Sequence, residues 1–204
     1  MNRKPARAGN LAGLFFKMEI NKKLIADCKK GNRKAQFQLF RNCFNTLMGV
    51  CVRYKRDQDE AKASVNEGFL KILNNLEKYN PEIPFEAWIK RIMINHVIDE
   101  FRKNRKVQEL IDYTDFSERN EANDPVDYNE ADILFDAGDI EEMIKTLPPV
   151  TQKVFNLYAV DGYPHKEIAS LLNMSEGTSK WHLNSARKKL KELLHKHVNA
   201  QKII

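Results

Sequence analysis

The chain has 204 residues, of which 42% are hydrophobic and 30% charged, a composition that suits a soluble globular protein rich in helix. No apolar run approaches the roughly 20 residues that a membrane span needs, so we expect no membrane insertion. The net charge of +6 is unevenly spread: residues 1–106 hold 23 basic and 11 acidic residues, 107–142 hold 1 and 13, and 143–204 hold 10 and 4. Two basic blocks flank an acidic connector, which suggests a polyanionic partner such as nucleic acid. Solvated helix faces are the alternative, and charge alone does not favour the partner over them.

The N-terminal stretch, residues 1–18, is basic with a short apolar core. No small-residue cleavage site follows it, so we expect a disordered extension rather than a signal peptide, with Met18 as an alternative start. The three cysteines, Cys28, Cys43 and Cys51, contain no C-x-x-C pair. Buried reduced thiols in a cytoplasmic protein are therefore expected, and a zinc site of ordinary spacing is not.

Residues 19–106 predict helices throughout. From Leu39 to Tyr54 apolar residues recur at spacings of three and four, which places them on one face of a long helix. The same pattern runs from Val65 to Leu76 after an acidic start. Two Pro-containing pairs, Asn80-Pro81 and Ile83-Pro84, then interrupt it. A further helix is expected from about Phe85 to Asn104, with basic residues at its C-terminal end.

Residues 107–139 are acidic, poor in aromatic residues and contain Asp124-Pro125, so they predict a flexible linker. Residues 140–197 predict a second helical domain, and 198–204 a tail. The expected fold is therefore all-α, with two helical domains joined by the acidic linker. The linker could shield the basic surfaces as a mimic of nucleic acid or act only as a solubilising spacer, and the sequence leaves both readings open.

The second domain predicts a helix-turn-helix. Asp161-Gly162 ends one helix and Pro164 is well placed as the first residue of the next. Asn173 tolerates the left-handed conformation that a tight turn needs, and Ser175 is a good N-cap for a last helix starting near Glu176. Such a second helix enters the major groove of DNA, whereas a packing hairpin is the alternative. The outer face offers side chains for base edges and phosphates: Lys180, Trp181, Asn184, Ser185, Arg187 and Lys188.

These residues carry a resemblance to a known family. The segments Gly162 to Ala169, Ser175 to Thr178 and Ala186 to Leu190 resemble region 4 of extracytoplasmic-function (ECF) sigma factors. The first block resembles region 2 of the same family. The matching residues there are Ala61, Glu67, Phe69, Leu70, Phe85, Trp88, Ile89, Ile92, Asn95, Asp99 and Arg102.

The resemblance implies a protein that binds core RNA polymerase and directs promoter-specific, DNA-templated transcription initiation. Region 2 would dock on the polymerase clamp helices through Val65, Asn66, Glu67, Phe69 and Leu70. It would hold the melted strand of the minus-ten element through Tyr79, Asn80, Glu82, Phe85, Trp88, Asn95, Arg102 and Lys103. Region 4 would contact the polymerase flap and read the duplex minus-thirty-five element through Thr178, Lys180, Trp181, Asn184, Ser185, Arg187 and Lys188. An anti-sigma factor is a further expected partner.

The chain departs from the family pattern at several positions. Lys62, Ala63 and Ser64 stand where region 2 usually has an acidic pair followed by Leu, and Asn66 replaces the usual Gln. In region 4, Ser179 replaces the usual Val, Asn173 the usual Gly and Trp181 a small polar residue. We expect Ser179 to loosen the packing of the recognition helix slightly. Individual polymerase contacts and the promoter sequence are therefore not carried over from relatives.

Some residues have a plainer structural reading beside the functional one. Trp88 is expected to anchor the core, with stacking on a base as the alternative role. Asn95 is expected to be a hydrogen-bonding core residue, with a base contact as the alternative. Asp99 with Arg102 reads as a solvated helix pair as readily as a DNA contact. Trp181, off the apolar face, favours a DNA or flap contact.

Two other classes of function compete with the sigma factor. A helix-turn-helix regulator would bind duplex DNA without polymerase, but it has no need of the Pro-broken loop and the helix that carries Trp88. An enzyme acting on nucleic acid would need clustered metal-ligand carboxylates or a nucleophile with a base, and the sequence shows neither. The five histidines are scattered. We therefore expect no catalytic residue, no cofactor, no metal site and no small-molecule substrate.

Overall fold

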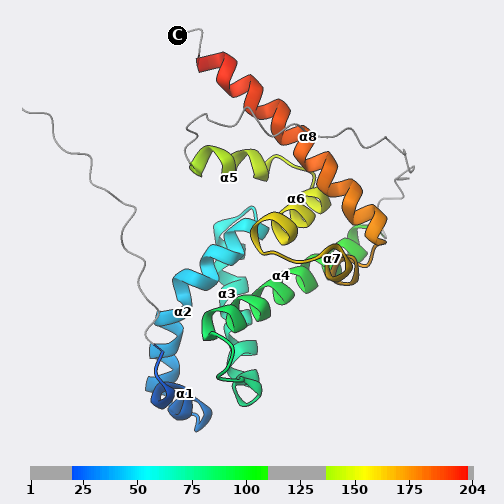
Figure 1. The fold of residues 1–204 in the computed structure, drawn as a ribbon. Helices are drawn as coiled ribbons and strands as arrows, with labels where there is room; N and C mark the ends of the chain where they lie inside the picture. Colours follow the sequence, from blue (N-terminus) through cyan, green and yellow to red (C-terminus); the bar gives the residue numbers. More distant parts are fainter. Residues whose placement is uncertain (1–19, 110–136, 202–204) are drawn as a thin grey trace, which may run out of the picture.

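The computed structural model describes residues 20–109 and 137–201, and within these ranges it is helical with no strand. The all-α prediction is confirmed. Figure 1 shows the elements as a first unit of α1 to α4 and a second unit of α5 to α8. The first unit comprises α1 (Lys22–Lys29), α2 (Arg33–Tyr54), α3 (Gln58–Asn75), the 3-10 turn η1 (Leu76–Lys78) and α4 (Phe85–Glu109). The second comprises α5 (Ala137–Lys145), α6 (Pro149–Phe155), the π-helical turn η2 (Asn156–Val160), α7 (His165–Leu172) and α8 (Glu176–Gln201).

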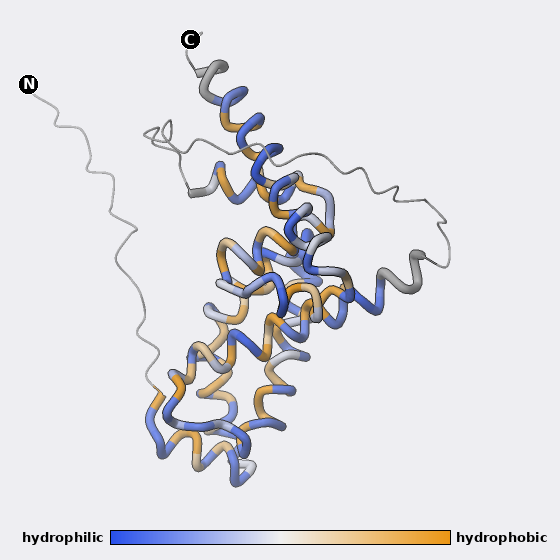
Figure 2. Tube along the Cα trace, turned by 45° about the vertical axis from the view of Figure 1, so that its right-hand side comes forward, coloured by the Kyte–Doolittle hydropathy of each residue, from blue (hydrophilic) through white to orange (hydrophobic). Residues whose placement is uncertain are grey.

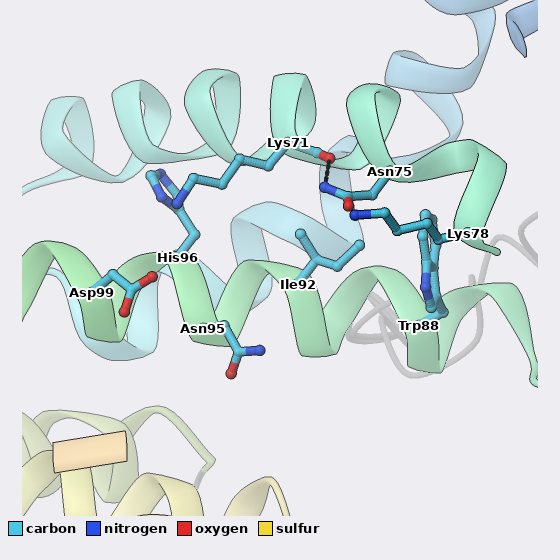
Figure 3. A pocket seen from close by; sticks show the side chains of 8 residues that line it. All are labelled: Lys71, Asn75, Lys78, Trp88, Ile92, Asn95, His96 and Asp99. Atoms are coloured by element: carbon cyan, nitrogen blue, oxygen red, sulfur yellow. Dashed lines mark hydrogen bonds between the residues drawn. The ribbon is translucent and has the colours of Figure 1, made fainter. Parts of the chain in front are cut away.

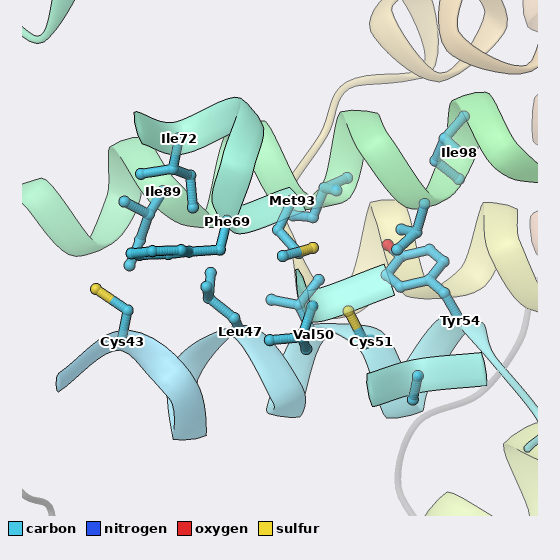
Figure 4. Packing of buried hydrophobic residues seen from close by; sticks show 14 of the residues in the cluster. Cys43, Leu47, Val50, Cys51, Tyr54, Phe69, Ile72, Ile89, Met93 and Ile98 are labelled. Carbon is cyan, nitrogen blue, oxygen red and sulfur yellow. The ribbon is translucent and has the colours of Figure 1, made fainter. Parts of the chain in front are cut away.

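Side-chain caps fix where the helices of the first unit begin. Asn21, Asn32 and Asp57 stand before α1, α2 and α3, and each side chain accepts a hydrogen bond from a backbone N–H of the first turn. The helices then bury the apolar faces that the spacing predicts. Figure 4 shows this core, in which side chains from α2, α3 and α4 meet. Leu39, Leu47, Val65, Ile72 and Ile98 are each at most 1% exposed.

Close packing brings α3 and α4 together at Gly68. A Cβ atom there would lie 2.3 Å from Met93 Cε and 3.2 Å from His96 Cδ2. The missing side chain therefore allows the backbone of α3 to approach α4 closely. This approach sets the side chains that flank Gly68 beside the middle of α4.

The helix-turn-helix of the second unit follows the local signals of the sequence. Asn173 has φ 53, the left-handed conformation expected for it, and ends α7. The Ser175 hydroxyl accepts the Thr178 N–H at 2.9 Å and so caps α8. Gly162 has φ +74 in the preceding turn, a conformation that favours glycine. Pro164 is the residue before the first turn of α7 rather than within it.

The two units pack against each other. Val154, Leu157, Ile168 and Leu172 of the second unit belong to the same buried cluster as the core of the first. Figure 2 shows the hydrophobic stretches of the chain gathered where the helices face one another, and Figure 1 shows α6 and α7 beside α4. We call this packing of α6, η2 and α7 on α2 and α4 the closed arrangement.

Two boundaries differ from the sequence prediction of a linker at 107–139. Helix α4 continues to Glu109, and α5 already begins at Ala137. The rest of the predicted linker, the N-terminal extension 1–18 and the end of the tail lie outside the described residues. The sequence analysis did not assign helix α5, because acidic residues dominate its sequence. Its apolar side is formed by the half-buried Met143 and Ile144.

Candidate nucleic-acid interface

A pocket of about 270 Å³ lies between α3 and α4. Figure 3 shows that side chains of α3 and η1 line one side of the pocket and side chains of α4 line the other. Two of the residues predicted to contact melted DNA, Trp88 and Asn95, line this pocket. The lining comprises Lys71, Asn75, Lys78, Trp88, Ile92, Asn95, His96 and Asp99.

Three aromatic rings anchor one end of the pocket. Tyr79, Phe85 and Trp88 have mutual centroid distances of 5.0 to 5.5 Å. The Tyr79 hydroxyl donates to the Ile83 carbonyl at 2.9 Å, which fixes the loop before α4. Phe85 is only 9% exposed, so it supports the cluster from the core and is not available to stack on a base. The half-buried Trp88 is a packing anchor that also lines the pocket.

The other predicted minus-ten residues lie on the loop or farther along α4. Asn80 and Glu82 are exposed, and the Asn80 side chain accepts the Glu82 N–H at 3.0 Å. Arg102 and Lys103 follow the pocket toward the C-terminal end of α4. Arg102 Nη1 lies 3.8 Å from Asp99 Oδ1, the solvated pair that the sequence suggested. None of these four residues lines the pocket.

The sequence reasoning missed the cationic side of the pocket. Lys71, Asn75 and Lys78 lie four and three residues apart, so they share one face of α3 and its continuation. Asn75 donates from Nδ2 to the Lys71 carbonyl at 2.8 Å, the dashed line in Figure 3. The helical spacing of polar residues between the core positions was a signal that could have found them.

The residues predicted to dock on polymerase divide into two groups. Val65 is fully buried and Phe69 is 7% exposed, so both belong to the core and cannot contact a partner directly. Asn66, Glu67 and Leu70 are exposed, and Leu70 is 59% exposed despite its apolar side chain. We call these three residues the docking face of α3.

The first half of α8 presents most of the predicted duplex-reading side chains. Lys180, Trp181, Asn184 and Lys188 are exposed, with Trp181 43% exposed, and we call them the recognition face. Ser185 is half-buried. The Thr178 hydroxyl is 2.8 Å from the Ser175 hydroxyl, so Thr178 helps to cap the helix.

Contacts with α7 and η2 hold α8 in place through Ser179 and Arg187. Ser179 is fully buried, and its hydroxyl lies 2.9 Å from His165 Nδ1. This hydrogen bond satisfies the polar atom that Ser179 buries in the packing. The sequence-based expectation of looser packing took no account of this bond. The His165 ring stacks on Tyr158, and the Arg187 guanidinium lies 5.9 Å from the centre of the same ring. Arg187 is thus held against η2 by a cation–π contact.

A buried polar cluster joins the two units. Asp161, which follows η2, accepts from Arg53 Nη2 and from the Tyr54 hydroxyl, each at 2.6 Å. Asn156 donates to the Arg53 carbonyl at 2.8 Å. Burial and the Asp161 carboxylate raise the pKa of Tyr54 well above its usual value, so its hydroxyl stays a donor. We call Arg53, Tyr54 and Asp161 the latch.

Lys153 of α6 lies in the same contact region and is only 6% exposed. Its Nζ sits 4.3 Å from the centre of the Phe101 ring. Burial, together with Arg56 and Lys55, lowers the pKa of Lys153 from 10.5 to about 8. No carboxylate among the described residues contributes to this shift, so burial of the Lys153 charge in the closed arrangement is not offset by an acidic partner there.

Two further observations concern classes of function that the sequence disfavoured. In the described part of the chain, Glu67, His96 and Glu100 form a group of ligand-type side chains whose ligand atoms lie within 4.8 Å of one another. Spacing along the sequence could not show this group, because Glu67 and His96 come from different helices.

Among residues 20–109 and 137–201, no helix is long and apolar enough to cross a bilayer.

Comparisons with known proteins agree with the two-unit architecture. The family model of Sigma-70 region 2 matches residues 39–107, and that of Sigma-70, region 4 matches residues 137–190. The chain is 25% identical to the ECF RNA polymerase sigma factor SigE of Mycolicibacterium smegmatis over 78% of this chain, but spans only 62% of SigE. It is 22% identical to the RNA polymerase sigma-H factor of Pseudomonas aeruginosa, over 86% of this chain and 94% of that protein.

Among solved structures, the chain is similar to the sigma factor RpoE of Bartonella quintana in complex with the anti-sigma factor NepR. That similarity has a TM-score of 0.47 and 21% identity, and covers 76% of this chain and 95% of RpoE. On the two family models and the sequence relatives, the chain belongs to the sigma-70 family, in the ECF group. It is therefore a transcription initiation protein, and a helix-turn-helix regulator that acts without polymerase is not favoured.

Proposed function

We propose that this sigma factor binds core RNA polymerase through the docking face of α3, holds melted minus-ten DNA at the α3–α4 pocket and reads duplex minus-thirty-five DNA with the recognition face of α8. The observation that carries the proposal is the separation of these surfaces from the core. Asn66, Glu67 and Leu70 project outward from α3, while Val65 and Phe69 of the same helix hold the fold together.

Leu70 provides the test of docking. A Leu side chain that is 59% exposed leaves apolar surface in water, and burying such surface at the centre of an interface is a main source of affinity. We expect Leu70→Asp to weaken binding to core polymerase by about tenfold or more, because replacing a central interface anchor typically costs about 2 kcal/mol or more. Fluorescence anisotropy of labelled sigma factor titrated with core polymerase measures this loss.

Phe37→Asp is the matched control, since Phe37 on α2 is 63% exposed and lies outside the docking face. It should leave the affinity for polymerase unchanged. Equal losses in both variants, or no loss in Leu70→Asp, would contradict the assignment of the docking face to α3.

The pocket suits an unpaired strand because it combines cationic and aromatic groups. Lys71 and Lys78 can neutralise phosphates, and Trp88 with Asn95 offers an apolar surface and an amide for an unstacked base. The exposed Lys103 farther along α4 extends the positive surface beyond the pocket. These roles are proposals, and they add Lys71 and Lys78 to the residues suggested by the sequence.

We propose that Asn184 reads a base edge of the duplex, whereas Lys188 contacts a phosphate. Asn can bond bidentately to adenine, so Asn184→Ala should cost about 1–3 kcal/mol at one upstream base pair and change which sequence is preferred. Lys188→Ala should instead weaken binding about equally across sequences and lower the salt dependence by about one counterion. Selection of upstream sequences by the reconstituted holoenzyme, at two salt concentrations, measures both effects. A uniform loss in both variants would contradict the base-reading role of Asn184.

The closed arrangement must open during promoter recognition. The minus-ten and minus-thirty-five elements are by their names about 25 base pairs apart, which is roughly 85 Å of B-DNA. In the closed arrangement α7 packs on α4, and Arg91 of α4 lies 3.3 Å from Glu167 of α7. We therefore infer that the closed molecule, which holds the helix-turn-helix beside α4, opens to place the pocket and the recognition face on the two elements together.

The remaining assignments are also proposals. A role with polymerase on a DNA template implies a cytoplasmic protein without an enzymatic activity of its own. An anti-sigma factor is proposed as a further partner because the sigma factor RpoE of Bartonella quintana was solved with the anti-sigma factor NepR. Core polymerase with promoter fragments, with and without this protein, tests the function as a whole, since only the complete mixture should yield specific transcripts.

A further inference from the structure

His96 is the most isolated polar side chain of the first unit. It is 2% exposed, and neither ring nitrogen has a hydrogen-bond partner. A buried polar atom without a partner costs free energy, so an imidazole in this position points to a ligand. Its Nε2 atom lies 3.8 Å from Glu67 Oε2 and 3.7 Å from Glu100 Oε2. These distances are too long for hydrogen bonds.

We propose that Glu67, His96 and Glu100 form a binding site for a divalent cation of the zinc class, which bridges α3 and α4. His96 and Glu100 are four residues apart and share one face of α4, while Glu67 approaches from α3. Zinc binds imidazole nitrogen and carboxylate oxygen at about 2.0–2.2 Å, which places tetrahedral ligands about 3.4 Å from one another. The three ligand atoms lie within 4.8 Å of one another, with His96 Nε2 at 3.7 and 3.8 Å from the two carboxylate oxygens, so side-chain rotations can bring them to this geometry.

The surroundings of the three residues suit a cation. The Ser64 hydroxyl donates to Glu100 Oε2 at 2.8 Å, and such a hydrogen bond orients a ligating carboxylate. Two carboxylates balance the charge of a divalent ion. Lys55 Nζ lies 3.4 Å from Glu100 Oε2 and would have to move away from the carboxylate when the cation binds.

The position of His96 also gives a cation access to the site. His96 lines the pocket between α3 and α4, which gives the cation a path from solvent. Three protein ligands leave a fourth position for water or an incoming ligand.

Titration of the untagged full-length protein with zinc chloride, in competition with a chromophoric chelator, tests the site. Glu67→Gln and His96→Gln should each weaken zinc binding by at least about tenfold, since even a change in a residue that only supports a ligand costs 10–100-fold. Glu67 is exposed, so its variant retains the fold even where replacing the buried His96 does not. Glu60→Gln, an exposed acid on the same helix, is the control and should bind zinc as the parent does.

Two further readouts separate this site from adventitious binding. Zinc should raise the melting temperature of the parent and of Glu60→Gln, but not that of Glu67→Gln, because a cation that bridges α3 and α4 stabilises only the folded state. Magnesium, which prefers oxygen ligands, should not displace zinc at equal concentration. Zinc affinity that is unchanged by Glu67→Gln, or displacement by equimolar magnesium, would overturn the proposal.

Discussion

Asp161→Asn is expected to destabilise the closed arrangement by about 3 kcal/mol, because removing one member of a buried ion pair typically costs about 3–5 kcal/mol. The Asp161 side chain is 8% exposed, while Arg53 keeps 26% exposure, which argues for the lower end of that range. An asparagine has the same shape but only one carbonyl oxygen. It can accept from Arg53 or from Tyr54, and its amide N–H groups then face the other donor.

The expected result is an open population about 100-fold larger than in the parent, since 1.4 kcal/mol corresponds to a factor of ten. Energy transfer between dyes on α2 and α8 should fall, and the melting temperature should drop by about 6–12 °C. Glu167→Gln is the matched control, because its pair with Arg91 also joins the units but is exposed, and such pairs contribute less than about 1 kcal/mol.

The same variant tests whether opening limits polymerase binding. If polymerase binds only the open form, the apparent affinity equals the affinity of the open form multiplied by the fraction of open molecules, so a variant that opens should bind more tightly. Unchanged energy transfer in Asp161→Asn would show that the latch does not hold the units together. Opening without a gain in polymerase affinity would instead show that the closed arrangement leaves the docking face available.

Local signals were sufficient to predict most helices and the helix-turn-helix. Asn173 and Ser175 act through their own backbone and side chains, so the left-handed turn and the cap follow from residue type alone. Regular apolar spacing likewise predicted the buried face of α2. The π-helical turn η2 escaped prediction because its apolar residues continue the helical pattern of α6, and nothing local indicates the change in hydrogen bonding.

The candidate site was predicted less completely, for two reasons. The family motif of region 2 combines core and surface positions, so Val65 and Phe69 were grouped with the docking residues although their three-and-four spacing with Ile72 indicates the core. Contacts between distant segments were invisible: Asp161 lies 108 residues from Arg53 along the chain, and Glu67 meets His96 only because α3 and α4 pack at Gly68.

Replacing the buried Lys153 with methionine is expected to stabilise the closed arrangement. Lowering of its pKa from 10.5 to about 8 corresponds to about 3 kcal/mol of unfavourable burial at neutral pH. The cation–π contact with Phe101 offsets about 1 kcal/mol of this cost. Lys153→Met keeps the apolar stem and removes the charge, so the closed arrangement should gain about 2 kcal/mol and melt roughly 4–8 °C higher at pH 7.

The buried Lys153 also makes the stability of the parent depend on pH in a definite direction. Below pH 8 the amine is protonated in both states, and the buried charge destabilises the closed, folded chain. Between about pH 8 and 10.5 the unfolded chain binds more protons than the folded one, so the parent should become more stable as pH rises through this window. Lys153→Met should lack that rise.

Melting temperatures of parent and Lys153→Met, compared from pH 7 to 10, isolate this group from others that titrate in the same range. Lys166→Met, which removes an exposed lysine from α7, should change stability by less than about 0.5 kcal/mol. A constant difference between parent and Lys153→Met across this range would mean that Lys153 is not desolvated. If the difference narrows toward pH 10 as expected, the contact region combines a stabilising latch with a destabilising buried lysine. Such opposed contributions keep the two units closed in the free protein while leaving the opening within reach of the binding free energy of polymerase.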